Sequence, residues 1–114
     1  GAVHAALCDH AASLYGKACG WPHYFYYDKK PDAKKVAVSG YYDGVNFARR
    51  LNVPSWFSFG YNDEVVPPNS AYATYNVVKA PRSLSIYPAT GHFWFQEQWE
   101  EWQAWLAKQL NVEK

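Results

Sequence analysis

The sequence has no methionine, only two cysteines and no long apolar run. None of its apolar stretches approaches the roughly 18 residues that a membrane-spanning helix needs, so we expect no membrane partner. Eleven Lys and Arg against ten Asp and Glu, without a basic stripe, argue against a nucleic-acid partner. The first residues include neither a methionine nor the basic-then-apolar layout of a signal peptide. Together these absences predict that the chain begins inside a longer gene product.

The two cysteines and three of the four histidines form no metal-ligand pattern. Cys8 and Cys19 are too far apart for a CxxC motif, and His4, His10 and His23 are not spaced with them as zinc ligands would be. We therefore interpret the thiols as buried or unpaired and these histidines as structural or exposed. No cofactor and no metal are expected.

What the sequence does contain is typical of a small packed domain. It has 114 residues, enough for one domain, and 49% of them are hydrophobic. Aromatic residues make up 19%, including six Trp and ten Tyr, which is more than a small core needs. Most will pack in the core, but such an excess also lines grooves that bind sugars and other flat ligands.

Short apolar segments alternate with helical patterns along the chain. Strands are predicted over 2–8, 55–59 and 83–87, and helices over 43–50, 71–79 and 96–109, with an irregular insertion or lid over 11–39. This order predicts an α/β fold of about three parallel strands alternating with helices. Three strands make a thin parallel sheet, so the segment looks like the end of a larger one.

Particular residues are expected at the ends and on the faces of these helices. Asp43 is predicted to cap the first helix, and Asn69 or Ser70 the second. In the last helix the three-and-four spacing predicts one buried face, made of Trp99, Trp102, Leu106 and Leu110.

Two polar side chains follow consecutive predicted strands, where ligands bind in open parallel sheets. Asp63 comes just after the strand that ends at Gly60, and His92 just after the strand that ends at Tyr87. An acid and a histidine at neighbouring strand ends can form one site, in which the carboxylate orients the imidazole and the imidazole takes a proton from a nucleophile. Taken singly, each is also a common loop residue, and Asp63 suits a turn.

A nucleophilic serine is the missing member of this pattern. In α/β-hydrolases the chain order is Ser, Asp, His, and the serine stands on a G-x-S-x-G turn. Ser13, Ser39 and Ser58 all lack the required pair of glycines. We therefore expect the nucleophile to lie upstream of this chain.

Several short motifs follow one another from Tyr42 to His92. They are Tyr42-Asp43-x-x-Asn46-Phe47-Ala48, Gly60-x-x-Asp63, Pro67-Pro68, Ala73-x-Tyr75-Asn76, Tyr87-Pro88 and Gly91-His92. In these motifs the chain resembles the acetyl xylan esterase and cephalosporin C deacetylase group, carbohydrate esterase family 7. The earlier Cys8-Asp9 also resembles that family's segment after the nucleophile strand.

The resemblance implies the C-terminal portion of an α/β-hydrolase fold and an esterase that removes acetyl groups from xylan or xylo-oligosaccharides. A serine would attack the ester, with His92 as base and then acid, and with Asp63 orienting it. Residues 1–114 would then be a single C-terminal fragment, inactive alone, whose partners are the missing N-terminal part of the same protein and an acetylated sugar.

Two other interpretations stay open. The chain could belong to another α/β-hydrolase, dienelactone hydrolase-like or prolyl-peptidase-like, with the same acid and histidine. It could instead be a non-catalytic module whose aromatic residues bind carbohydrate.

An unpaired edge on the first strand predicts homo-oligomers. A polysaccharide substrate favours a periplasmic or secreted location over the cytoplasm.

Overall fold

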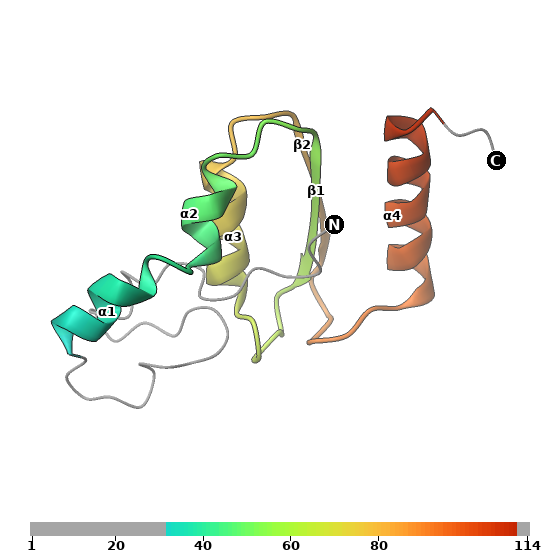
Figure 1. Ribbon diagram of the computed structural model, residues 1–114. Coiled ribbons are helices and arrows are strands. Elements are labelled where there is room, and N and C mark those ends of the chain that lie inside the picture. The colour runs from blue at the N-terminus through green and yellow to red at the C-terminus, as the bar shows by residue number, and fades with distance from the viewer. Residues whose placement is uncertain (1–31, 112–114) are drawn as a thin grey trace.

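The computed structural model describes residues 32–111. In this part the chain forms α1 (Ala33–Ser39), α2 (Gly44–Ala48), β1 (Ser55–Gly60), α3 (Pro68–Val77), β2 (Arg82–Tyr87) and α4 (Gln96–Gln109) (Figure 1). The strand expected over 2–8, both cysteines, His4, His10, His23 and the 11–31 part of the expected insertion lie outside the described residues. The last part of that insertion is helical, as α1.

The two described strands are parallel neighbours, and α3 connects them. Their register runs from Ser55 opposite Arg82 to Gly60 opposite Tyr87, so both strands end at the same level. A parallel pair needs such a crossover connection, and here the helix supplies it. The α/β class predicted from the sequence is therefore confirmed, and β1–α3–β2 is one βαβ unit.

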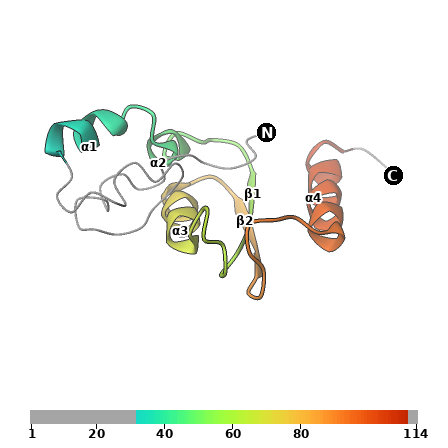
Figure 2. The ribbon, with the colours of Figure 1, turned by 90° about the horizontal axis from the view of Figure 1, so that it is seen from below.

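Helices cover both faces of this sheet, with α3 on one face and α4 on the other (Figures 1 and 2). Successive side chains of a strand point to opposite faces. Phe57 and Phe59 of β1 therefore point toward α3, where their rings meet Tyr75 and Tyr72 edge-on at centroid distances of 5.5 and 4.8 Å. The α3 face of the sheet is thus closed by aromatic packing.

The opposite face of the sheet is linked to α4 by polar side chains. The Gln98 amide Nε2 donates to the Ser58 hydroxyl at 2.6 Å, and the Ser85 hydroxyl donates to a Glu101 carboxylate oxygen. Gln98 and Glu101 are three residues apart and so lie on the same face of the helix. The side of α4 that faces the sheet is therefore partly polar.

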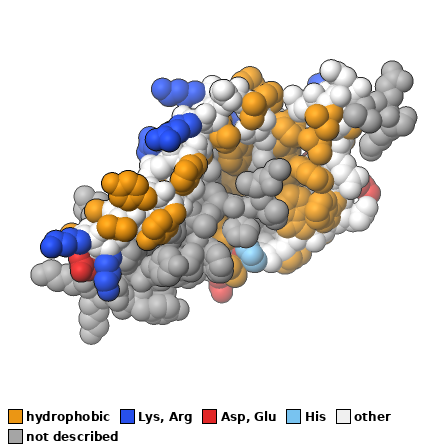
Figure 3. Space-filling model, in the orientation of Figure 1, with side chains coloured by type: hydrophobic (Ala, Val, Ile, Leu, Met, Phe, Trp, Pro, Cys, Tyr) orange, Lys and Arg blue, Asp and Glu red, His pale blue; other side chains and the backbone are white. Residues whose placement is uncertain are grey.

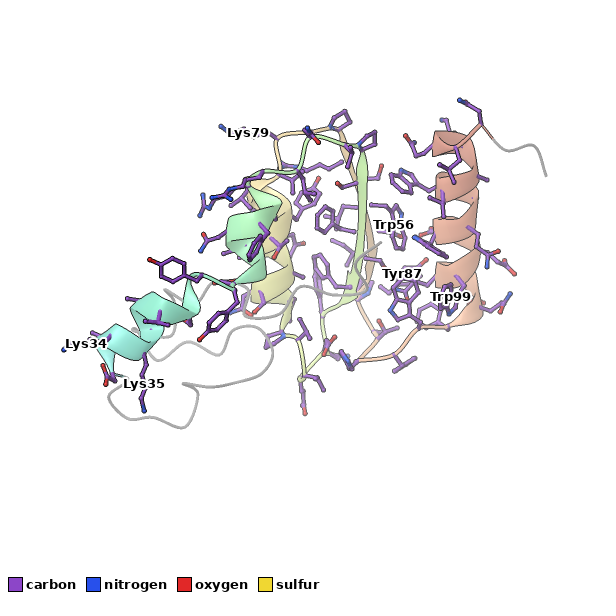
Figure 4. All side chains as sticks on the ribbon, in the orientation of Figure 1. Lys34, Lys35, Trp56, Lys79, Tyr87 and Trp99 are labelled. Atoms are coloured by element: carbon purple, nitrogen blue, oxygen red, sulfur yellow. The ribbon has the colours of Figure 1, made fainter. Side chains whose placement is uncertain are left out.

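This arrangement corrects the predicted buried face of α4. Trp99 is 43% exposed and Leu110 is 62% exposed, whereas Gln98 is only 4% exposed. Trp102 and Leu106 are half-buried, so the prediction is wrong at Trp99 and Leu110, and it missed Gln98, whose amide binds Ser58. The tryptophans still pack, since Trp99 lies 4.9 Å from Trp94 and joins a layer between the sheet and α4 in which Trp56 and Tyr87 also lie (Figure 4).

One of the predicted helix caps is confirmed and the other is wrong. Asp43 is fully buried, and its carboxylate accepts from the Val45 N–H at 3.1 Å at the start of α2. By contrast, α3 begins at Pro68, ahead of Asn69 and Ser70, with Pro67 as its cap and no side-chain cap hydrogen bond. The fixed φ of proline suits the first turn of a helix, so the helix starts earlier than a polar cap would place it.

The apolar core of the described residues is small. Its buried members come from α1, α2, β1 and the end of α3, namely Val36, Val45, Ala48, Phe59 and Val78. Other hydrophobic side chains reach the surface and gather over the region between the strands and α4 (Figure 3). Within residues 32–111, no helix is long and apolar enough to cross a membrane.

Candidate active site

The loops that leave the carboxyl ends of β1 and β2 are joined to each other. The Asn62 N–H donates to the Thr90 carbonyl at 3.0 Å, which links the two loops. Thr90 is in turn held by the end of its own strand, since its backbone N–H and its hydroxyl both donate to the Tyr87 carbonyl, at 3.1 and 2.9 Å. The strand ends and their loops therefore form one hydrogen-bonded edge.

Gly60 allows this close approach of the two loops. A Cβ placed on Gly60 would overlap the Thr90 carbonyl, with the carbonyl carbon only 2.8 Å away. Non-bonded carbon atoms make favourable contacts only at about 3.5–4.0 Å, so any side chain here would push the Thr90 loop away. The absence of a side chain at Gly60 keeps the loop that carries His92 against the loop that carries Asp63.

The Asp63 carboxylate is fixed by its own loop. Its Oδ1 accepts from the Val65 N–H at 2.9 Å and from the Val66 N–H at 2.8 Å. This is an Asx turn, in which a side chain takes over the hydrogen bonding of the backbone. The side chain of Asp63 is 11% exposed, so the carboxylate is held still and largely shielded from water.

His92 contacts this carboxylate through one ring nitrogen. The Nδ1–H donates to Asp63, with Nδ1 2.9 Å from Oδ2 and 3.1 Å from Oδ1. A proton held on Nδ1 leaves Nε2 as the basic nitrogen. The His92 side chain is 47% exposed, and its Nε2 makes no hydrogen bond to residues 32–111. The structure thus brings together the two residues singled out in the sequence and leaves one nitrogen open to react.

Tyrosine side chains flank this edge on both sides. The hydroxyls of Tyr61 and Tyr72 are 3.0 Å apart, which ties the start of the Asp63 loop to α3. This hydrogen bond from Tyr61 is the main reason that the pKa of Tyr72 is raised. On the α4 side, burial and the nearby Glu101 carboxylate raise the pKa of Tyr87, while the Ser85 hydroxyl acts in the opposite direction. The phenols of Tyr72 and Tyr87 therefore stay neutral at ordinary pH.

Neither a metal site nor a nucleophile accompanies the pair in the described part of the chain. No group of three or more His, Cys, Asp or Glu side chains in residues 32–111 is placed to hold a metal ion. No serine of these residues hydrogen-bonds His92, and Ser58 is bound to Gln98 instead. The arrangement can accept a proton at Nε2 and stabilise the resulting imidazolium.

Sequence reasoning found Asp63 and His92 but missed the residues that hold them together. Nothing in the sequence signals that the Thr90 carbonyl pairs with the Asn62 N–H. Gln98 was passed over because the tryptophan spacing dominated the pattern of its helix. A glutamine three residues after a helix cap is the one local signal that would have drawn attention to it.

Comparison with known proteins gives a family match and a curated relative. Residues 19–109 match the family model described as acetyl xylan esterase (AXE1). The chain is 38% identical over 110 residues to "Acetyl esterase Axe7A" of Xylanibacter ruminicola. That alignment covers 96% of this chain and only 25% of the relative, so the chain spans about a quarter of the relative's length.

Solved structures show the same fold at lower sequence identity. "Acetyl xylan esterase from Paenibacillus sp. R4" matches with a TM-score of 0.70 at 22% identity, over 90% of this chain and 34% of that one. Acetyl xylan esterase 1 from Thermoanaerobacterium sp. JW/SL YS485 matches with a TM-score of 0.72 at 21% identity, over 90% of this chain and 35% of that one. The α/β arrangement therefore corresponds to about a third of each of these chains.

Proposed function

Because the chain belongs to the acetyl xylan esterase (AXE1) family, we propose that the protein carrying it is an esterase that removes acetyl groups from xylan or xylo-oligosaccharides. The curated relative is named an acetyl esterase, which supports the same reaction class. The observation that carries the proposal is the hydrogen bond between His92 Nδ1 and the shielded Asp63 carboxylate at the ends of two parallel strands.

In the proposed mechanism a serine hydroxyl attacks the acetyl carbonyl while His92 Nε2 takes its proton. The new bond joins the serine oxygen to the acetyl carbon, and Asp63 stabilises the imidazolium through Nδ1. The bond from the acetyl carbon to the sugar oxygen then breaks, and His92 returns the proton to the leaving oxygen. Water attacks the acetyl-enzyme by the same route and releases acetate and the free serine.

The serine of this mechanism is proposed to lie upstream of this chain. No G-x-S-x-G turn occurs in its 114 residues, and in α/β-hydrolases the nucleophile precedes the acid. The isolated chain should then not turn over an ester or react with a fluorophosphonate probe. Turnover accompanied by a labelled serine would contradict this part of the proposal.

The test of the function uses the native polypeptide that carries this sequence. His92→Ala should lower kcat on nitrophenyl acetate and on acetylated xylo-oligosaccharides by roughly a thousandfold or more, because the general base is lost. Glu64→Ala is the matched control, since Glu64 is an exposed acid next to Asp63. Full activity in His92→Ala would refute the proposal.

A substrate panel separates the alternatives. Hydrolysis of peptide nitroanilides with no activity on acetylated sugars would favour a peptidase-like relative. Sugar binding that is unchanged in His92→Ala, without any hydrolysis by the wild type, would favour a carbohydrate-binding module. Self-association and a periplasmic or secreted location stay proposals, which sedimentation and cell fractionation would test.

A further inference from the structure

Gln98 occupies an unusual place in the first turn of α4. It is the third residue of the helix, where a glutamine commonly turns back to the N–H of the capping residue. Here the capping residue, Phe95, makes no side-chain cap hydrogen bond, and the Gln98 Oε1 does not accept from its N–H. The Gln98 amide points into the sheet instead, donates to the Ser58 hydroxyl at 2.6 Å and is 4% exposed.

Stability alone does not explain this buried glutamine. Its Oε1 is buried and has no hydrogen-bond partner among the described residues. An unpaired buried amide oxygen disfavours the folded state, whereas an apolar side chain of the same shape would not. Such a group is uncommon in native structures and calls for an explanation.

The hydrogen bond joins the two elements that carry the candidate site. Ser58 belongs to β1, whose carboxyl end leads to Asp63, and Gln98 belongs to α4, which begins soon after His92. The partners are 40 residues apart in sequence. The loops that follow β1 and β2 are joined as well, by the hydrogen bond from the Asn62 N–H to the Thr90 carbonyl. The segments that carry Asp63 and His92 are thus joined between the sheet and α4 as well as along the strands and at the loop edge.

We propose that Gln98 is a positioning residue, which fixes α4 to β1 through Ser58 and thereby holds His92 in register with the Asp63 carboxylate. A displacement of α4 along the sheet would move the Pro88–Phe95 loop and lengthen the contact between Nδ1 and the carboxylate. Small misplacements of a catalytic group cost far more in rate than in binding. The expected fall in kcat rests on the proposed function, whereas the expected change in the position of His92 does not.

The test replaces Gln98 with methionine, which has a similar shape and no amide. In the native polypeptide, Gln98→Met should lower kcat on nitrophenyl acetate about tenfold, with KM and the melting temperature unchanged. Ser58→Ala should act in the same direction, and the double variant should lose no more than either single variant, because one interaction is removed. If Gln98→Met fails to fold, Ser58→Ala tests the same hydrogen bond.

A spectroscopic readout follows the positioning itself. The proton resonance of the His92 Nδ1–H reports its hydrogen bond to Asp63, and it should shift or broaden in Gln98→Met. The matched control is Gln103→Met, which makes the same replacement at an exposed glutamine of the same helix. It should leave both kcat and this resonance at their wild-type values.

Each remaining outcome has a definite meaning. Unchanged kcat and an unchanged resonance in folded Gln98→Met and Ser58→Ala would overturn the inference. An equal loss in Gln103→Met, or a loss that follows a fall in melting temperature, would reduce Gln98 to a structural residue and also overturn it. If His92→Ala keeps full activity, the proposed function fails, and the resonance alone then decides the role of Gln98.

Discussion

The middle of the β1–β2 sheet meets its two helices through different side chains. Toward α3, Phe57 and Phe59 meet tyrosine rings edge-on, and Phe59 is only 8% exposed. Toward α4, Trp56 and Tyr87 also lie in an aromatic layer, but serine hydroxyls bind Gln98 and Glu101 as well. Apolar burial gives stability without direction, whereas hydrogen bonds fix one geometry.

The two faces of the sheet support different residues of the candidate site. On the α3 face, β1 packs on α3 and leads to Asp63. The Asp63 carboxylate is already held by two N–H groups of its own loop. The opposite face packs on α4, the helix that follows His92. In the described residues, the only hydrogen bonds of the His92 side chain go to Asp63. The segment that carries His92 has fewer local contacts, and Gln98 and Glu101 anchor the helix that follows it to the sheet.

The largest effect on stability is expected on the α3 face. Phe59→Ala should lower the free energy of unfolding by about 3–5 kcal/mol, because it leaves a cavity beside Tyr72. Urea unfolding of the chain measures this loss. A cost below about 1 kcal/mol would show that the α3 face is not the stabilising one.

An intermediate effect is expected at Gly60, where the loop that carries Asp63 contacts the loop that carries His92. Gly60→Ala should lower the free energy of unfolding by about 1–3 kcal/mol, since the added Cβ overlaps the Thr90 carbonyl. In the native polypeptide it should also lower kcat, because the His92 loop is pushed from Asp63. A variant with wild-type stability and activity would show that the two loops separate freely.

The smallest effect is expected from an aromatic residue of the α4 face. Trp99→Ala should cost about 1 kcal/mol, since the ring is 43% exposed and loses mainly its contacts with Trp94 and Trp102. Measured by urea unfolding beside Phe59→Ala, it compares the two faces directly. Equal costs for the two substitutions would abolish the distinction between them.

Local patterns in the sequence predicted most elements from α2 onward but not how they face one another. The helix over 96–109 was predicted with the bounds of α4, and the strands agree within one residue. Asp63 and His92 were brought to one edge because parallel strands end together. The buried face of α4 was wrong at Trp99 and Leu110, and it missed Gln98, whose partner Ser58 lies 40 residues away in sequence and gives no periodic signal.

The most direct test of the Asp63–His92 pair is Asp63→Asn in the native polypeptide. The remaining oxygen can still accept from Val65 and Val66, while the new NH₂ group faces His92 and forces the ring proton onto Nε2. We predict that kcat on nitrophenyl acetate falls by about ten-thousand-fold with an unchanged melting temperature. A folded Asp63→Asn variant that keeps most of its kcat would contradict the account, because the carboxylate would then not orient the catalytic base.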